Sequence, residues 1–93
     1  MQTNPQPQDA QQLLQVTTMI GKLLLEYGAE VYRAEDTMQR VAKSAGNVRE
    51  VDVLATPGWL FVSFHMGNAS HTKMRRVRTA TIDLAKVHRL NEL

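Results

Sequence analysis

The densest group of polar and charged side chains lies between residues 30 and 40, where the apolar residues have helical spacing. Its members are Glu30, Arg33, Glu35, Asp36, Thr37 and Arg40. The pairs Glu30–Arg33 and Asp36–Arg40 have the separations that bring side chains together on one side of a helix. Such a face could bind a carboxylate or a protein partner, although a solvated helix with surface ion pairs gives the same pattern. The candidates for binding a substrate or a partner are Glu30, Arg33, Glu35, Thr37 and Arg40.

A basic run near the end of the chain is the strongest local electrostatic feature. It consists of Lys73, Arg75, Arg76 and Arg78. These cations could contact phosphate groups, and Trp59, Phe61 and His65 on one face of the preceding predicted strand could stack bases. Because aromatic residues make up only 5% of the chain, we expect them to lie in the core under covering helices. We therefore expect no nucleic-acid partner, and an exposed aromatic platform would favour the alternative, a nucleic-acid-binding module.

Metal binding and nucleophilic catalysis both require side chains that converge. His65 and His71 flank a predicted turn and could, with Asp52, approach a zinc ion, but nothing in their spacing demands it. Ser63 precedes His65 by two residues, which places both on one strand face without the geometry of a nucleophile and its base. We expect no metal site, no cofactor and no catalytic residues.

Composition narrows the class of protein. The chain has 93 residues, of which 43% are hydrophobic and 22% charged, as in one globular domain rather than a disordered segment. A net charge of +2 is too small to indicate, by itself, that the chain binds nucleic acid. The absence of cysteine excludes disulfides, thiolate ligands and thiol catalysis. No apolar run approaches the roughly 18–20 residues of a membrane-spanning helix.

Apolar periodicity predicts two helices at the start of the domain. Residues 1–8 are rich in Gln and Pro, so we expect a disordered lead-in, and Asp9 is the expected cap of the first helix. The predicted apolar stripe of this helix is Leu13, Val16, Ile20, Leu23, Leu24 and Tyr27. Gly21 would allow close helix packing, and Gly28 would end the helix. A second helix begins near Val31, and its apolar stripe stops before residues 46–47.

From residue 48 onward the apolar residues recur at every second position, which predicts strands. Residues 48–55 and 59–65 form a predicted antiparallel hairpin, and residues 71–79 a polar edge strand. Residues 83–93 form a predicted C-terminal helix capped by Asp83. The expected fold class is α+β, with two N-terminal helices, a small three-stranded antiparallel sheet and a C-terminal helix. The expected core is Leu13, Ile20, Leu24, Val31, Met38, Val41, Val53, Leu60, Val62 and Phe64.

Three segments in order carry a family resemblance. They are GKLLLEYGAEVYRAEDTM at 21–38, VDVLATPGWLFVS at 51–63, and RRVR at 75–78 with IDLAKVHRLN at 82–91. Together they resemble the N-terminal region of the threonine/serine exporter family of bacterial membrane proteins, over about residues 10–93. Gly28, Glu30, Arg33, Glu35 and Thr37 fall on the family pattern.

The resemblance implies that residues 9–93 are the soluble N-terminal domain of a longer membrane transporter, at the cytoplasmic face of the bacterial inner membrane. It implies secondary export of threonine, serine or, in some relatives, dicarboxylates. A regulatory or assembly role is expected, with the exporter's own membrane-spanning region, a second transporter component or a second copy of the chain as partners. A small hydrolase-like domain acting with the transporter is an alternative.

Overall fold

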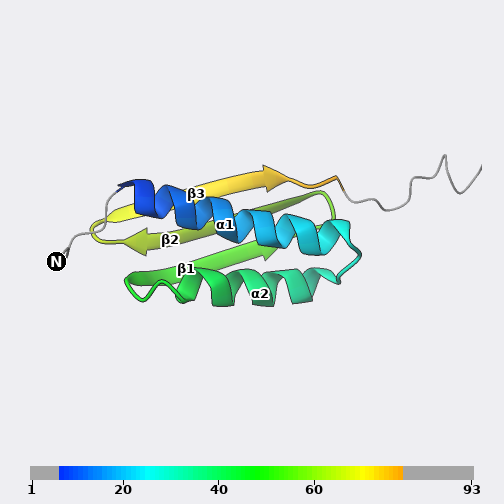
Figure 1. The fold of residues 1–93 in the computed structure, drawn as a ribbon, viewed down its shortest axis with the longest axis horizontal. Helices are drawn as coiled ribbons and strands as arrows, with labels where there is room; N and C mark the ends of the chain where they lie inside the picture. Colours follow the sequence, from blue (N-terminus) through cyan, green and yellow to red (C-terminus); the bar gives the residue numbers. More distant parts are fainter. Residues whose placement is uncertain (1–6, 79–93) are drawn as a thin grey trace, which may run out of the picture.

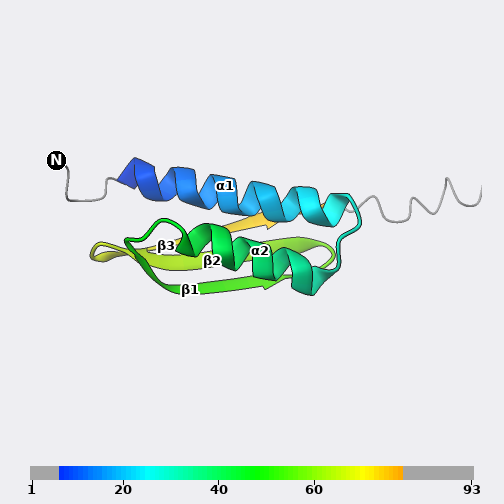
Figure 2. The ribbon, with the colours of Figure 1, turned by 60° about the horizontal axis from the view of Figure 1, so that its bottom comes forward.

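The computed structural model describes residues 7–78, which form two helices and three strands. The elements are α1 (Pro7–Glu26), α2 (Val31–Lys43), β1 (Val48–Ala55), β2 (Trp59–Met66) and β3 (Ala69–Arg76). The strands form one antiparallel sheet in the order β1-β2-β3, so β3 is an edge strand, as predicted. Both helices lie on the same face of the sheet, and no described element covers the other face (Figures 1 and 2). The α+β class is confirmed, and the predicted helix over residues 83–93 lies outside the described residues.

The ends of α1 show how local chemistry sets the helix. It begins at Pro7, so the prediction that Asp9 caps it is wrong, and Asp9 instead lies in the first turn. A carboxylate is favourable there because the N-terminal end of the helix dipole is positive. The helix stops at Gly28, which has φ of 95°. The Gly28 and Ala29 N–H groups donate to the Leu25 and Leu24 carbonyls, at 3.1 and 2.9 Å, in the pattern of a Schellman cap.

Two tight turns and one bulge shape the sheet. Between β1 and β2, the Thr56 hydroxyl accepts hydrogen bonds from the Gly58 and Trp59 N–H groups, at 3.2 and 3.1 Å. The turn between β2 and β3 consists of two residues, Gly67 and Asn68, and Gly67 has φ of 66°. Because this turn is so short, β3 begins at Ala69 rather than at the predicted residue 71. The β1 register shifts after Arg49, where Glu50 has the left-handed φ of 54°.

The buried face of α1 differs from the predicted one. It consists of Ala10, Leu14, Thr17, Thr18, Gly21 and Leu25. The predicted stripe lies at the margin of this face: Leu13, Ile20 and Leu24 are half-buried, whereas Val16 is 49% exposed and Tyr27 is 86% exposed. Both stripes have helical spacing, but the buried one contains the small residues, which allow the helix to approach the sheet closely.

The remaining core lies between β2 and α2. Leu60, Val62 and Phe64 of β2 and Met38 of α2 are fully buried, as predicted. The other predicted core residues are only half-buried, and they are Leu13, Ile20, Leu24, Val31, Val41 and Val53. They lie at the margin of the core because the helices cover the sheet as a single layer with open edges.

Three elements meet at Gly21. A Cβ atom built on this residue would lie 2.9 Å from Met38 Cγ and 3.0 Å from Leu60 Cδ2, and would also contact Met38 Sδ. Side chains do not tolerate such distances in a close-packed interior. The prediction that Gly21 permits close packing is therefore confirmed, and the site joins α1, α2 and β2.

We predict that Gly21→Ala destabilises the domain although alanine favours helix by about 1 kcal/mol. Overpacking against Met38 and Leu60 should outweigh that gain and leave a net loss of about 1–3 kcal/mol in the free energy of unfolding. Urea denaturation measures it. Gly58→Ala is the control, because a Cβ on Gly58 meets nothing within 4 Å. An unchanged or raised midpoint for Gly21→Ala would contradict the close approach.

Two adjacent buried hydroxyl groups in α1 have different surroundings. Thr18 Oγ1 donates to the Leu14 carbonyl at 2.8 Å and accepts from Arg75 Nε at 3.0 Å. Thr17 Oγ1 is equally buried and has no hydrogen-bond partner among the described residues. An unsatisfied buried hydroxyl costs roughly 1–3 kcal/mol.

Thr17→Val should therefore raise the melting temperature, because it keeps the shape of the side chain and removes the unsatisfied oxygen. Thr18→Val should lower it, because the Arg75 guanidinium loses the acceptor of its Nε–H group. Differential scanning calorimetry on the two variants tests the assignment, which fails if both substitutions shift the melting temperature in the same direction.

Candidate functional site

The polar residues of α2 do not form one cluster. Glu35 faces the sheet, where its Oε2 accepts a hydrogen bond from the Ala55 N–H at 2.8 Å. Ala55 is the last residue of β1, so this bond fixes the start of α2 against the end of the strand. The Glu35 carboxylate therefore acts as a connection between two elements of the fold.

The other predicted binding residues of α2 lie toward solvent. Glu30 precedes the helix as its N-cap residue, without a side-chain capping bond, and is exposed. Arg40 pairs with Asp36 at 3.2 Å, with both side chains exposed, and Arg33 is exposed as well. An exposed helical ion pair contributes only about 0.3–0.5 kcal/mol. Thr37 is half-buried.

Strand alternation divides the basic run. Lys73 and Arg75 pair with Val62 and Leu60 and so lie on the helix-covered side of β3, whereas Arg76 lies on the opposite side, opposite Trp59. Arg75 also donates from Nη2 to Gln15 Oε1 at 3.0 Å, in addition to its bond with Thr18, and so ties β3 to α1. Arg78 is exposed beyond the end of the strand. The described structure thus does not gather these cations into one phosphate-binding patch.

The uncovered face of the sheet carries the aromatic residues. The expectation that helices cover Trp59, Phe61 and His65 is wrong, because the helices pack on the alternate residues of β2. Phe61 pairs with Leu54 of β1 on one side and Met74 of β3 on the other, which makes a row across all three strands. Leu54 is 48% exposed and Met74 is 63% exposed. We call Leu54, Trp59, Phe61 and Met74 the open face.

Polar residues lie next to the open face on the same side of the sheet. Thr72 donates to Ser63 Oγ at 3.3 Å, and both lie in register with Asp52. His65 Nε2 lies 3.2 Å from Glu50 Oε1 at the bulge.

The positions of the histidines bear on two hypotheses from the sequence, a zinc site and a nucleophile–base pair. His71 pairs with Phe64 and therefore lies on the helix-covered side, so it cannot converge with His65 on a metal ion. Among residues 7–78 no cluster of three metal-ligating side chains occurs. The Ser63 hydroxyl meets Thr72 rather than His65, so the described part of the open side has no nucleophile–base pair.

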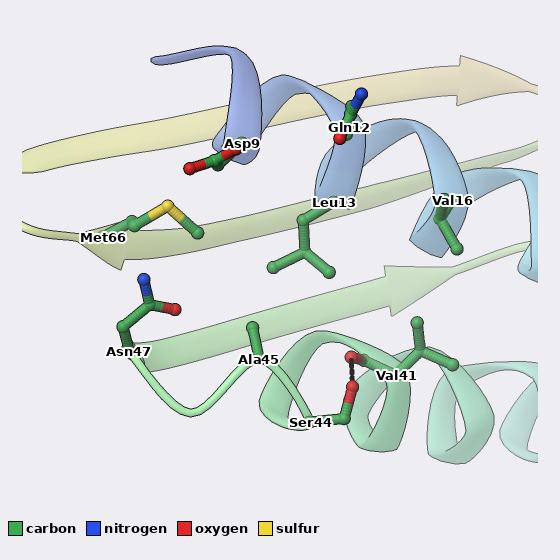
Figure 3. Close-up of a pocket in the computed structure, with 9 residues that line it drawn as sticks. All are labelled: Asp9, Gln12, Leu13, Val16, Val41, Ser44, Ala45, Asn47 and Met66. Carbon is green, nitrogen blue, oxygen red and sulfur yellow. Dashed lines mark hydrogen bonds between the residues drawn. The ribbon is translucent and has the colours of Figure 1, made fainter. Parts of the chain in front are cut away.

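An open groove lies between the start of α1 and the end of α2 (Figure 3). Its volume is about 450 Å³. The residues that line it are Asp9, Gln12, Leu13, Val16, Val41, Ser44, Ala45, Asn47 and Met66. Sequence reasoning missed this groove because it assigned Leu13 to the core and Val16 to the apolar stripe of the first helix. The exposed, uncharged surface of α1 could have indicated it.

Comparison with protein families gives one match over most of the chain. The model of the threonine/serine exporter family matches residues 15–93. The chain belongs to the threonine/serine exporter family. Searches of curated proteins and of solved structures found no match. Membership of an exporter family implies membrane association, and residues 7–78 contain no helix that is long and apolar enough to span a membrane.

Two substitutions test which α2 residues have a structural role. Glu35→Ala should lower the free energy of unfolding by about 1–2 kcal/mol, because the N–H of the buried Ala55 loses its acceptor. Arg33→Ala should change it by less than about 0.5 kcal/mol, as expected for an exposed side chain. Guanidinium denaturation of both variants measures the difference, and equal effects would contradict the structural role of Glu35.

Proposed function

We propose that this chain is an assembly domain of a threonine/serine exporter and that its open face docks on the cytoplasmic loops of the exporter's membrane-spanning part. The observation that carries the proposal is the uncovered apolar row Leu54–Phe61–Met74. In an antiparallel sheet with one covered face, the other face is normally polar and solvated. An apolar row across a whole solvent-facing sheet marks an interaction surface.

The composition of the row suits a protein partner. Phe61 lies at its centre, flanked by Leu54 and Met74, and Trp59 is the next residue on the same side of β2. Aromatic residues and methionine are enriched at the centres of protein–protein interfaces, with polar groups at the rim. Here the rim is supplied by Asp52, Ser63 and Thr72, which form the adjacent row.

Charge at the rim supports cytoplasmic loops as the partner. Asp52 and the exposed Glu50 border the apolar row on the β1 side. Cytoplasmic loops of membrane proteins carry an excess of Lys and Arg. These acidic side chains at the β1 edge are complementary to such loops, whereas Arg76, opposite Trp59, makes the β3 edge of the same face positive, so the charge would direct the β1 edge toward the loops.

Export measurements on the complete exporter test the proposal. Met74→Glu places a charge at the β3 end of the apolar row without disturbing the core. Efflux of threonine and serine should therefore fall at least ten-fold, which corresponds to about 1.4 kcal/mol of docking free energy. The exporter should still reach the membrane in normal amounts.

Arg33→Glu is the control, since it changes charge at an exposed position of α2 on the opposite side of the domain. Its efflux should stay within about two-fold of the wild type, as expected for a change outside the interface. Normal efflux with Met74→Glu, or a larger loss with Arg33→Glu, would contradict docking through the open face.

A further inference from the structure

The outward side of α1 is a second apolar surface, separate from the open face. It consists of the exposed Val16, Met19 and Leu23, the half-buried Leu13 and Ile20 at its margin, and the exposed Tyr27 just past the end of the helix, and we call it the α1 ridge. The opposite side of the same helix already packs on the sheet and α2. A helix that is apolar on two sides is normally buried on both. Among the described elements, only one side of α1 is covered (Figure 2).

The spacing of the ridge specifies the kind of partner. Leu13, Val16, Ile20, Leu23 and Tyr27 follow steps of three, four, three and four residues. This alternation is the repeat of a coiled-coil seam, in which each side chain enters a hole formed by a facing helix with the same repeat. The groove lined by Leu13 and Val16 lies along the α2 side of the ridge (Figure 3).

We propose that the α1 ridge pairs with the α1 ridge of a second copy of this chain. Every copy presents the same seam, and a two-fold interface requires one surface that can face itself. No charged residue lies between Asp9 and Lys22, so two ridges can meet without like charges at the centre. The dimer is independent of the proposed docking function, because the ridge and the open face lie on opposite sides of the molecule.

Other occupants fit the ridge less well. A helix that lies on lipid carries several Lys or Arg residues along its polar side, and α1 carries only Lys22. In the C-terminal part of the sequence, Leu84, Val87, Leu90 and Leu93 recur at steps of three only. Such steps would turn progressively around a helix and would not maintain a seam.

Sedimentation equilibrium on the 93-residue chain tests the pairing. The wild type should form a dimer at high micromolar concentration, and Leu23→Glu should weaken the dimer at least ten-fold. Met74→Glu is the matched control on the open face and should leave the dimer unchanged. Tyr27→Glu is a second ridge variant, at a position too exposed to affect folding, and should also weaken the dimer.

Each outcome decides the proposal. Loss of the dimer in the folded Tyr27→Glu and Leu23→Glu variants, with the Met74→Glu dimer intact, supports it. A wild-type monomer up to millimolar concentration overturns it, as does a dimer that survives Tyr27→Glu. Loss of the dimer only with Met74→Glu overturns it as well, and assigns self-association to the open face.

Discussion

The missing side chain at Gly21 is the constraint on which the arrangement of this domain depends. Met38 and Leu60 occupy the space that a Cβ atom would fill, so α1, α2 and β2 can meet at one point. Once α1 is held at this distance, its small residues face inward. Leu14 and Leu25 are buried with them, whereas Val16, Met19 and Leu23 stay exposed and form the centre of the α1 ridge.

Two polar connections hold the helix layer on the sheet. Arg75 joins β3 to Thr18 and Gln15 of α1, and Glu35 joins α2 to the end of β1. These charged residues would otherwise be candidates for phosphate or carboxylate binding, and the structure instead uses them in the fold. Because both connections lie on the covered side of the sheet, the opposite side remains available to a partner.

The sequence predicted the class and order of the described elements because their periods are distinct, and Gly28 ended α1 as expected. It could not predict which side of α1 is buried, since both Leu14–Thr18–Leu25 and Val16–Ile20–Leu23 have helical spacing. The former is buried because Gly21, on the same side of α1, approaches Met38 and Leu60, which are distant in sequence. The division of the basic run also escaped prediction, although alternation in a strand implies that Arg75 and Arg76 face opposite sides.

Covering of the open face in the assembled exporter is the central claim, and cysteine labelling tests it directly. The chain has no cysteine, and Met74 and Tyr32 are both 63% exposed on different surfaces. In the isolated chain, maleimide should label Met74→Cys and Tyr32→Cys at similar rates. In the complete exporter in its membrane, labelling of Met74→Cys should slow at least ten-fold while that of Tyr32→Cys is retained. Equal labelling of both positions in the assembled exporter would contradict the account.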